Sequence, residues 1–236
     1  MMDIVDFHSH VLPGIDDGSA SLEESIAMLR MAAEQRVGRV VATPHFYPRH
    51  DTPERFLARR EAAEIRLREE MERHTGLPQL SVGAEVYYFS GISDCDALLQ
   101  LTIDKKHCIM LEMKSSPWDT YAFREVEGIS SKLGLTPMIA HVDRYIAPFK
   151  TYGIPQKLQE LPVLVQANAS FFLNRATRSM AFRMLKKGQI HLLGSDCHDL
   201  ERRPPRLGDA IELIRTHGCS HELQRMESLG SEILFP

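Results

Sequence analysis

Residues 5–18 read VDFHSHVLPGIDDG, and this stretch decides the fold. It places His8 and His10 one residue apart at the end of a short apolar run, before a turn that carries the adjacent carboxylates Asp16 and Asp17. Side chains i and i+2 of a β-strand point to the same face. The two imidazoles therefore converge, and the stretch predicts a strand that ends in part of a metal-binding site.

The rest of the chain repeats this arrangement of a short apolar strand and a polar residue. The predicted strands are residues 3–7, 39–43, 80–84, 108–111, 136–140, 163–167 and 190–194. Helical patterns cover residues 21 to about 38, 53–75 and 119–133, a segment that ends at Gly188, and residues 207–217. Strands that alternate with helices indicate parallel βαβ units. Seven of them predict an α/β barrel slightly smaller than the eight-stranded form, in a single domain over residues 1–236.

Polar residues follow the last apolar residue of most of these strands. They are His8, His10, His45, Glu85, Glu112, His141, Asp196 and His198. In a parallel barrel the carboxyl ends of the strands gather at one face, where active sites lie. Imidazole and carboxylate suit Zn, Mn or Fe, and so many carboxylates at one mouth are costly without cations. The pattern therefore predicts a metal centre.

Composition narrows the classes of protein. The net charge of −4, with Lys and Arg dispersed, makes a nucleic-acid-binding surface unexpected. The four cysteines are scattered without C-x-x-C spacing, so neither a disulfide scaffold nor a zinc ribbon is expected, and a reducing cytoplasm is the expected location. Asp3 and Asp6 stand where a signal peptide needs a basic and then an apolar run, and no apolar stretch approaches the ~20 residues of a membrane span.

The ordered motifs resemble the polymerase and histidinol phosphatase (PHP) superfamily. The motifs are H-S-H-x-L-P-G-I-D-D-G, then T-P-H, G-x-E, L-E, A-H-x-x-R-Y and S-D-x-H. Within the superfamily, residues 12–18, 140–145, 166–170 and 195–198 are similar to the bacterial capsule-biosynthesis tyrosine phosphatases of the CpsB/CapC type. The similarity runs from Asp3 to about Gly208 and implies a distorted TIM-like (β/α)7 barrel of the PHP type.

The resemblance also implies three bound metal ions, Mn or Fe first and Zn as the alternative. His8, His10, Glu85 and Asp196 would hold the first ion. Glu85 would bridge to the second, completed by Glu112 and His141, and Asp17, His45 and His198 would hold the third. Asp16 is the alternative to Asp17, because two adjacent aspartates on a turn cannot be ranked by sequence.

The expected chemistry is hydrolysis of a phosphate ester. A metal pair lowers the pKa of a bound water from ~15.7 towards ~7 and so provides hydroxide to attack phosphorus. Arginine offers planar bidentate donors for the phosphate. Arg144, three residues after His141, is the first candidate and is also implied by the resemblance; Arg203 is the second, with Arg202 less favoured.

The family resemblance implies a phosphotyrosyl protein as substrate, expected to be a tyrosine autokinase that controls capsule or exopolysaccharide synthesis. Aromatic residues in loops on the same face offer a groove for such a peptide, although ordinary packing is the simpler interpretation. They are Phe46, Tyr47, Trp118 and Tyr121. The sequence does not determine the oligomeric state, and a homo-oligomer is compatible with it.

Other functions remain open at this point. Two segments have spacing near that of cysteine phosphatases, but His107-Cys108 is followed at the required position by Lys114, and the segment from Cys197 to Arg203 contains acidic residues. The nearest rival is a phosphatase for a small metabolite such as histidinol phosphate. A non-catalytic metal-binding regulator, an amidohydrolase and a DNA exonuclease are less favoured.

Overall fold

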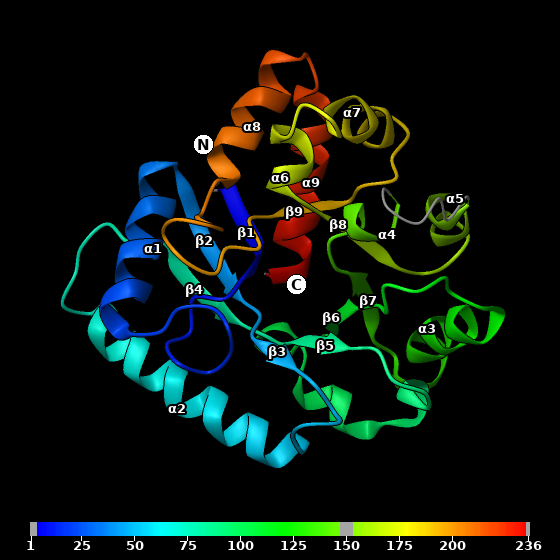
Figure 1. The fold of residues 1–236 in the computed structure, drawn as a ribbon, viewed down its shortest axis with the longest axis horizontal. Helices are drawn as coiled ribbons and strands as arrows, with labels where there is room; N and C mark the ends of the chain where they lie inside the picture. The colour runs from blue at the N-terminus through cyan, green and yellow to red at the C-terminus, as the bar shows by residue number, and fades with distance from the viewer. Residues whose placement is uncertain (1–3, 147–152, 235–236) are drawn as a thin grey trace.

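The computed structural model describes residues 4–146 and 153–234, so Asp3, the first residue of the expected opening strand, lies outside the described residues. Within these described residues, nine strands form two parallel sheets (Figure 1). The three-stranded sheet has the order β1 (Ile4–Ser9), β2 (Val37–Ala42) and β4 (Gln79–Val82). The six-stranded sheet has the order β3 (His45–Phe46), β5 (Glu85–Tyr87), β6 (Cys108–Glu112), β7 (Thr136–Ile139), β8 (Leu164–Asn168) and β9 (Leu192–Gly194).

The nine strands occupy seven positions around a ring. β3 continues the path of β2 after Thr43 and Pro44, and β5 continues that of β4. Pro44 has no N–H, which interrupts the ladder, but its carbonyl accepts from the N–H of Glu85 at 3.0 Å. Each split strand therefore passes from one sheet to the other.

Backbone hydrogen bonds between the first and last strands close the ring. The His8 carbonyl accepts from the N–H of Asp196 at 2.8 Å, and the N–H of His10 donates to the Cys197 carbonyl at 2.9 Å. The expected distorted α/β barrel is thus confirmed, although the sheet is divided and two of the seven predicted strands are broken.

Helices surround the strands (Figure 1). Their bounds are α1 (Leu22–Glu34), α2 (Pro53–Met71), α3 (Thr120–Leu133), α4 (Asp143–Ile146), α5 (Ile154–Gln159), α6 (Ala169–Leu173), α7 (Arg178–Lys186), α8 (Leu207–Thr216) and α9 (Ser220–Leu234), with short 3-10 helices η1 (Ile92–Asp94), η2 (Asp96–Gln100) and η3 (Ile103–Lys105). Side-chain oxygens of Ser21, Thr52 and Asp119 cap α1, α2 and α3.

The helices differ from the predicted ones: α2 ends at Met71 rather than near residue 75, and α4, α5 and α6 were not expected. The first helix was expected to reach Gly38, but it ends at Glu34, because Arg36 adopts a left-handed φ of 64° and β2 already begins at Val37. The final helix α9 was not expected. Its buried residues Leu223, Met226, Gly230 and Leu234 follow helical spacing.

Two packed clusters support the site. The larger joins the helices to the strands. The smaller contains Val41, Met110, Met138 and Leu192, side chains from strands placed around the ring, together with Leu234 of α9. Side chains from such distant strands meet only inside the ring, so this cluster fills the barrel and fixes the strand ends above it.

Candidate metal centre

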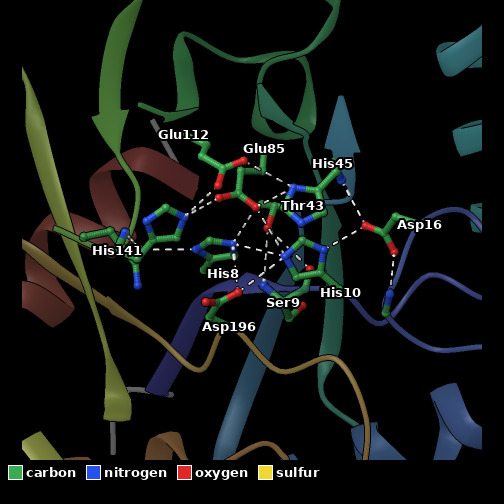
Figure 2. Close-up of polar contacts among 12 residues, drawn as sticks. His8, Ser9, His10, Asp16, Thr43, His45, Glu85, Glu112, His141 and Asp196 are labelled. Carbon is green, nitrogen blue, oxygen red and sulfur yellow. Dashed lines mark hydrogen bonds and ion pairs between the residues drawn. The ribbon is translucent and has the colours of Figure 1, made fainter. Parts of the chain in front are cut away.

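The polar residues expected at the strand ends come together in one group, and all of them except His45 and Glu112 are buried (Figure 2). His8 lies in β1, Glu85 begins β5 and Glu112 ends β6, while His141 follows β7 and Asp196 follows β9. His141 and Asp196 adopt positive φ values of 33° and 54°. Such backbone is uncommon for non-glycine residues and clusters at functional sites.

The first set contains His8, His10 and Glu85, with Asp196 beside them. Glu85 Oε2 lies 3.1 Å from His8 Nε2 and 3.4 Å from His10 Nε2. Asp196 Oδ1 lies 3.5 and 3.6 Å from the same two nitrogens. Four potential ligand atoms therefore lie close together, from the four residues that the resemblance assigns to the first ion.

The second set is organised around the other oxygen of Glu85. Glu85 Oε1 lies 2.7 Å from His141 Nε2, and Glu112 Oε1 lies 3.9 Å from that nitrogen. His45 also belongs here, because its Nδ1 lies 3.0 Å from Glu85 Oε2 and 3.7 Å from Glu112 Oε2. His45 thus stands between two sets, whereas the sequence placed it in the third alone.

The third set contains His10, Asp17, His45 and His198. Asp17 Oδ1 lies 3.4 Å from His45 Nε2 and 3.5 Å from His198 Nε2. The ring centroids of His10 and His198 are 3.8 Å apart. His10 therefore lies beside both the first and the third sets.

Asp16 and Asp17 have different surroundings, which the sequence could not distinguish. Asp16 is buried: its Oδ2 accepts from His10 Nδ1 at 2.8 Å and from the N–H of His45 at 2.9 Å. Burial alone would raise its pKa, but these hydrogen bonds and the nearby His10 lower it to about 2. Asp17 is 68% exposed and points its carboxylate at His45 and His198. Asp16 is thus placed to orient a ligand and Asp17 to be one.

Three histidines are held in one tautomer. His8 Nδ1 lies 3.2 Å from Gln166 Oε1, His10 Nδ1 lies 2.8 Å from Asp16 Oδ2, and His198 Nδ1 lies 3.1 Å from the Asp196 carbonyl. Each partner accepts, so each Nδ1 carries the proton. Each Nε2 atom therefore faces the group, the orientation found in histidines that bind metals.

The imidazole nitrogens and carboxylate oxygens of the cluster are packed too closely for hydrogen bonds alone to pair them all. His8 Nε2 lies 3.2 Å from His10 Nε2. Within the described part of the chain, the buried atoms His45 Nδ1 and His198 Nε2 have no hydrogen-bond partner. Orphaned buried nitrogens beside carboxylates fit a bound cation.

The pKa shifts reflect the same crowding. Burial alone lowers the pKa of His10, but the carboxylates of Asp16, Asp196 and Glu85 raise it well above its usual value. Burial alone raises the pKa of Glu85, but the neighbouring histidines lower it well below its usual value. Without a metal ion, protonated imidazoles would provide the positive charge that balances the negative charge of the carboxylates.

Two arginines approach from the side of β9. Arg144 Nη2 lies 2.5 Å from Asp196 Oδ2, and Arg203 Nη2 lies 2.6 Å from Asp196 Oδ1. Both line a cavity of about 500 Å³ with Asn168 and Ser170. Arg202 also lines this cavity but is exposed, and among its described contacts only its backbone N–H reaches a nearby carboxylate, that of Asp199. The structure therefore brings together the two arginines that the sequence selected.

Gln166 begins one of the motifs that carry the family resemblance, residues 166–170, but no role in the site was predicted for it from the sequence. It is fully buried on β8, and its Oε1 accepts from the backbone N–H of His141 at 2.6 Å as well as from His8. Its Nε2 donates to Asn168 Oδ1, and Asn168 Nδ2 donates to Asp196 Oδ2 at 2.8 Å. The available signal was an amide inside an apolar strand, since buried polar groups require partners.

Of the four aromatic residues expected to form a groove, only Tyr47 stands beside the metal centre. Its ring stacks on His45 with centroids 5.0 Å apart. Phe46 and Trp118 are buried in the larger core cluster, and Tyr121 is exposed on α3. Ordinary packing, the simpler interpretation of the sequence, is therefore confirmed for Phe46 and Trp118, and the four residues do not form one groove.

The cysteines are poorly placed for nucleophilic catalysis. Cys108 and Cys197 are buried. Burial raises the pKa of Cys108 to about 12 and also raises that of Cys197. Both groups therefore remain thiols, whereas the nucleophile is the thiolate.

A search of the described residues finds no helix with the length and apolar character needed to span a membrane.

Comparison with known proteins gives consistent matches. The family model for capsular polysaccharide synthesis, CpsB/CapC, matches residues 4–229. The chain is 28% identical over 229 residues to the tyrosine-protein phosphatase CpsB of Streptococcus pneumoniae, covering 89% of each. It is 25% identical over 240 residues to the tyrosine-protein phosphatase YwqE of Bacillus subtilis, covering 98% of this chain and 91% of YwqE.

Solved structures share the fold. A crystal structure from work on YwqE of Bacillus subtilis and CpsB of Streptococcus pneumoniae, named as metal-dependent tyrosine phosphatases, aligns with a TM-score of 0.80 and 21% identity over 93% of this chain and 89% of that chain. A variant of an organophosphorus hydrolase from Deinococcus radiodurans aligns with a TM-score of 0.56 and 17% identity, over 100% of this chain and 93% of that chain.

Proposed function

This chain belongs to the CpsB/CapC family of capsular polysaccharide synthesis, and we propose that it is a metal-dependent protein-tyrosine phosphatase. The observation that carries the proposal is the buried group of imidazoles and carboxylates at one end of the barrel, with two arginines beside it. The relatives named tyrosine-protein phosphatases, matched over nearly their whole length, give the substrate class.

We assign nine residues to three metal ions. His8, His10, Glu85 and Asp196 would hold one ion, Glu85, Glu112 and His141 a second, and Asp17, His45 and His198 a third. The two oxygens of Glu85 face different histidines, which suits a bridging carboxylate. Mn or Fe is our first choice and Zn the alternative, since imidazole and carboxylate ligands suit all three. Bound there, the ions would supply Lewis acidity and a water activated at neutral pH.

Arg144 and Arg203 are the proposed phosphate-binding residues. Both guanidinium groups contact Asp196, so Asp196 holds them beside the metal centre. Burial alone lowers the pKa of Arg144, but Asp196, Glu85 and Glu112 raise it, so its charge is retained. Planar donors placed in this way can bind the phosphate oxygens and stabilise charge that develops in the transition state.

The demands on a general acid are modest. The tyrosine phenol has a pKa of ~10 and leaves more readily than an alcohol. The main task of the protein is therefore to position the phosphate and to keep other charged groups away from it.

The proposed biological setting is the cytoplasm, with residues 1–236 acting as one phosphatase domain. The proposed substrate is a phosphotyrosyl protein, a tyrosine autokinase that controls capsule or exopolysaccharide synthesis. The family match to capsular polysaccharide synthesis supports the link to capsule synthesis.

The test compares three substrates with metal-loaded protein: a phosphotyrosyl peptide, the matching phosphoseryl peptide and histidinol phosphate. We expect the highest kcat/KM for the phosphotyrosyl peptide. A preference for histidinol phosphate would overturn the assignment of the substrate and leave the assignment of the metal centre unchanged. Absence of turnover for all three would indicate a metal-binding regulator.

A further inference from the structure

A second cavity, of about 540 Å³, adjoins the metal centre through Tyr47 and shares no lining residue with the cavity of Arg144 and Arg203. Three segments line it: Tyr47 to His50 after β3, Tyr87 to Ser90 at the end of β5, and Lys114 after β6. These segments follow His45, Glu85 and Glu112 along the chain, and β3, β5 and β6 are neighbours in the sheet (Figure 1). The cavity therefore opens at the same end of the barrel as the metal centre.

Tyr47 is the wall shared by the metal centre and this cavity. One face of its ring stacks on His45 at 5.0 Å, and its ring centroid lies 5.6 Å from that of Tyr87. Its hydroxyl lies 3.5 Å from Glu112 Oε2 as a donor. An aromatic surface thus runs from a proposed metal ligand into the cavity.

The two cavities beside the metal centre differ in chemistry. The cavity next to Arg144 offers guanidinium, amide and hydroxyl groups, which suit phosphate oxygens. The cavity beyond Tyr47 is lined by the rings of Tyr87, Tyr88 and Phe89, and Arg49, His50 and Lys114 also belong to its lining. Phe89 is half-buried. Aromatic rings prefer offset or edge contacts with other rings.

We propose that the cavity lined by Tyr47, Tyr87 and Phe89 receives the phenyl ring of a phosphotyrosyl residue and selects aryl over alkyl phosphates. A single oxygen joins the ring to phosphorus, so a phosphate held at the metal centre places its ring next to Tyr47. An alkyl phosphate has no group that fills this space. The inference rests on the proposed function and specifies how that site distinguishes phosphotyrosine from phosphoserine.

Two variants change the size of the cavity in opposite directions, and both should weaken its contact with a phenyl ring. Phe89→Ala removes part of its aromatic wall, and Ser90→Trp fills its exposed edge. Tyr121→Ala is the control, because Tyr121 is an exposed aromatic residue that is not among those lining the cavity. The ratio of kcat/KM for the phosphotyrosyl peptide to that for the phosphoseryl peptide is measured for each metal-loaded protein.

Phenol is a better leaving group than an alcohol in the wild type and in every variant. This difference therefore cancels when the phosphotyrosyl-to-phosphoseryl ratio of kcat/KM for a variant is divided by that for the wild type. We expect the ratio to fall about five- to tenfold in Phe89→Ala and in Ser90→Trp, in line with the worth of an aromatic contact, and to stay unchanged in Tyr121→Ala. Calorimetry with benzylphosphonate and methylphosphonate gives a second readout without chemistry. The wild type should bind benzylphosphonate at least tenfold more tightly, and both cavity variants should reduce that advantage.

The outcomes separate this inference from the proposed function. A wild type that hydrolyses the phosphotyrosyl peptide, with both ratios unchanged in the variants, would overturn the inference alone. A wild type that hydrolyses neither peptide and binds neither phosphonate would overturn both.

Discussion

Gln166 and Asp16 act on the metal centre through hydrogen bonds to histidine Nδ1 atoms. Gln166 Oε1 accepts from His8 and from the N–H of His141, and Asp16 Oδ2 accepts from His10 and from the N–H of His45. Each residue therefore fixes a ring and a stretch of backbone at once. Partners of this kind are worth tenfold to hundredfold in metal affinity.

Replacing Gln166 should weaken metal binding. Gln166→Met keeps the side-chain length but removes the acceptor, so His8 loses the bond that fixes its tautomer. We expect metal affinity to fall about tenfold to hundredfold by calorimetry. Gln189→Met is a matched control, because Gln189 is also buried and donates to Gln159 Oε1, an acceptor outside the metal centre. Equal losses of metal affinity in both variants would show that the loss comes from lower overall stability and not from the contact with His8.

Asp16→Ala and Asp17→Ala should differ in their effects on the stability of the metal-free protein, and Asp17→Ala should weaken binding of the third metal ion more. Asp17→Ala alters an exposed side chain and should change the free energy of unfolding of metal-free protein by less than about 0.5 kcal/mol, yet lower the metal content. Asp16→Ala should lower that free energy by about 1–3 kcal/mol, because it leaves buried donors unpaired. Metal analysis and chemical denaturation measure the two effects. Loss of metal from Asp16→Ala with full retention in Asp17→Ala would reverse the assignment.

The seam between β1 and β9 positions both His8 and Asp196. It closes through backbone bonds, and Gly194 sits within it where a Cβ would lie 2.5 Å from His8 Cβ and 2.8 Å from Gln166 Nε2. The approach is too close for any side chain. The glycine is thus part of the metal centre, although it offers no ligand.

Gly194→Ala should displace His8 and Gln166 together. We expect a loss of about 1–3 kcal/mol in the free energy of unfolding, the usual cost of overpacking, and weaker metal binding. Gly188→Ala is the control: Gly188 has φ +67° in open space, so alanine there is strained but remote from the site. An unchanged metal affinity in Gly194→Ala would contradict the role assigned to this seam.

Elements whose identity depends on local pattern were predictable from the sequence. The apolar runs before His8, Glu112 and His141 predicted strands that are present, and their parallel arrangement predicted that these residues meet. The breaks after β2 and β4 were not predictable, because they arise where the ring is divided between two sheets. The position of His45 between two ligand sets and the contacts of Gln166 depend on tertiary packing. The spacing of residues along one sequence does not predict such packing.

The whole metal centre should exchange protons for metal. Burial alone lowers the pKa of His10, but Asp16, Asp196 and Glu85 raise it well above 6.5, so the metal-free ring stays protonated at neutral pH. Binding requires the neutral ring. Affinity should therefore rise with pH until the raised pKa is passed, by about tenfold per pH unit for each proton released. Calorimetry at pH 7 in buffers of different ionisation enthalpy should show proton release, and none would contradict this balance.

The most direct test of the account is metal removal and return. Wild-type protein is stripped with EDTA and dialysed, and Mn²⁺ is then added in steps while metal content and turnover of a phosphotyrosyl peptide are measured together. We predict that turnover disappears on stripping, returns with metal occupancy, and remains in metal-loaded Cys108→Ser and Cys197→Ser. Turnover that survives complete removal of metal would contradict the central claim.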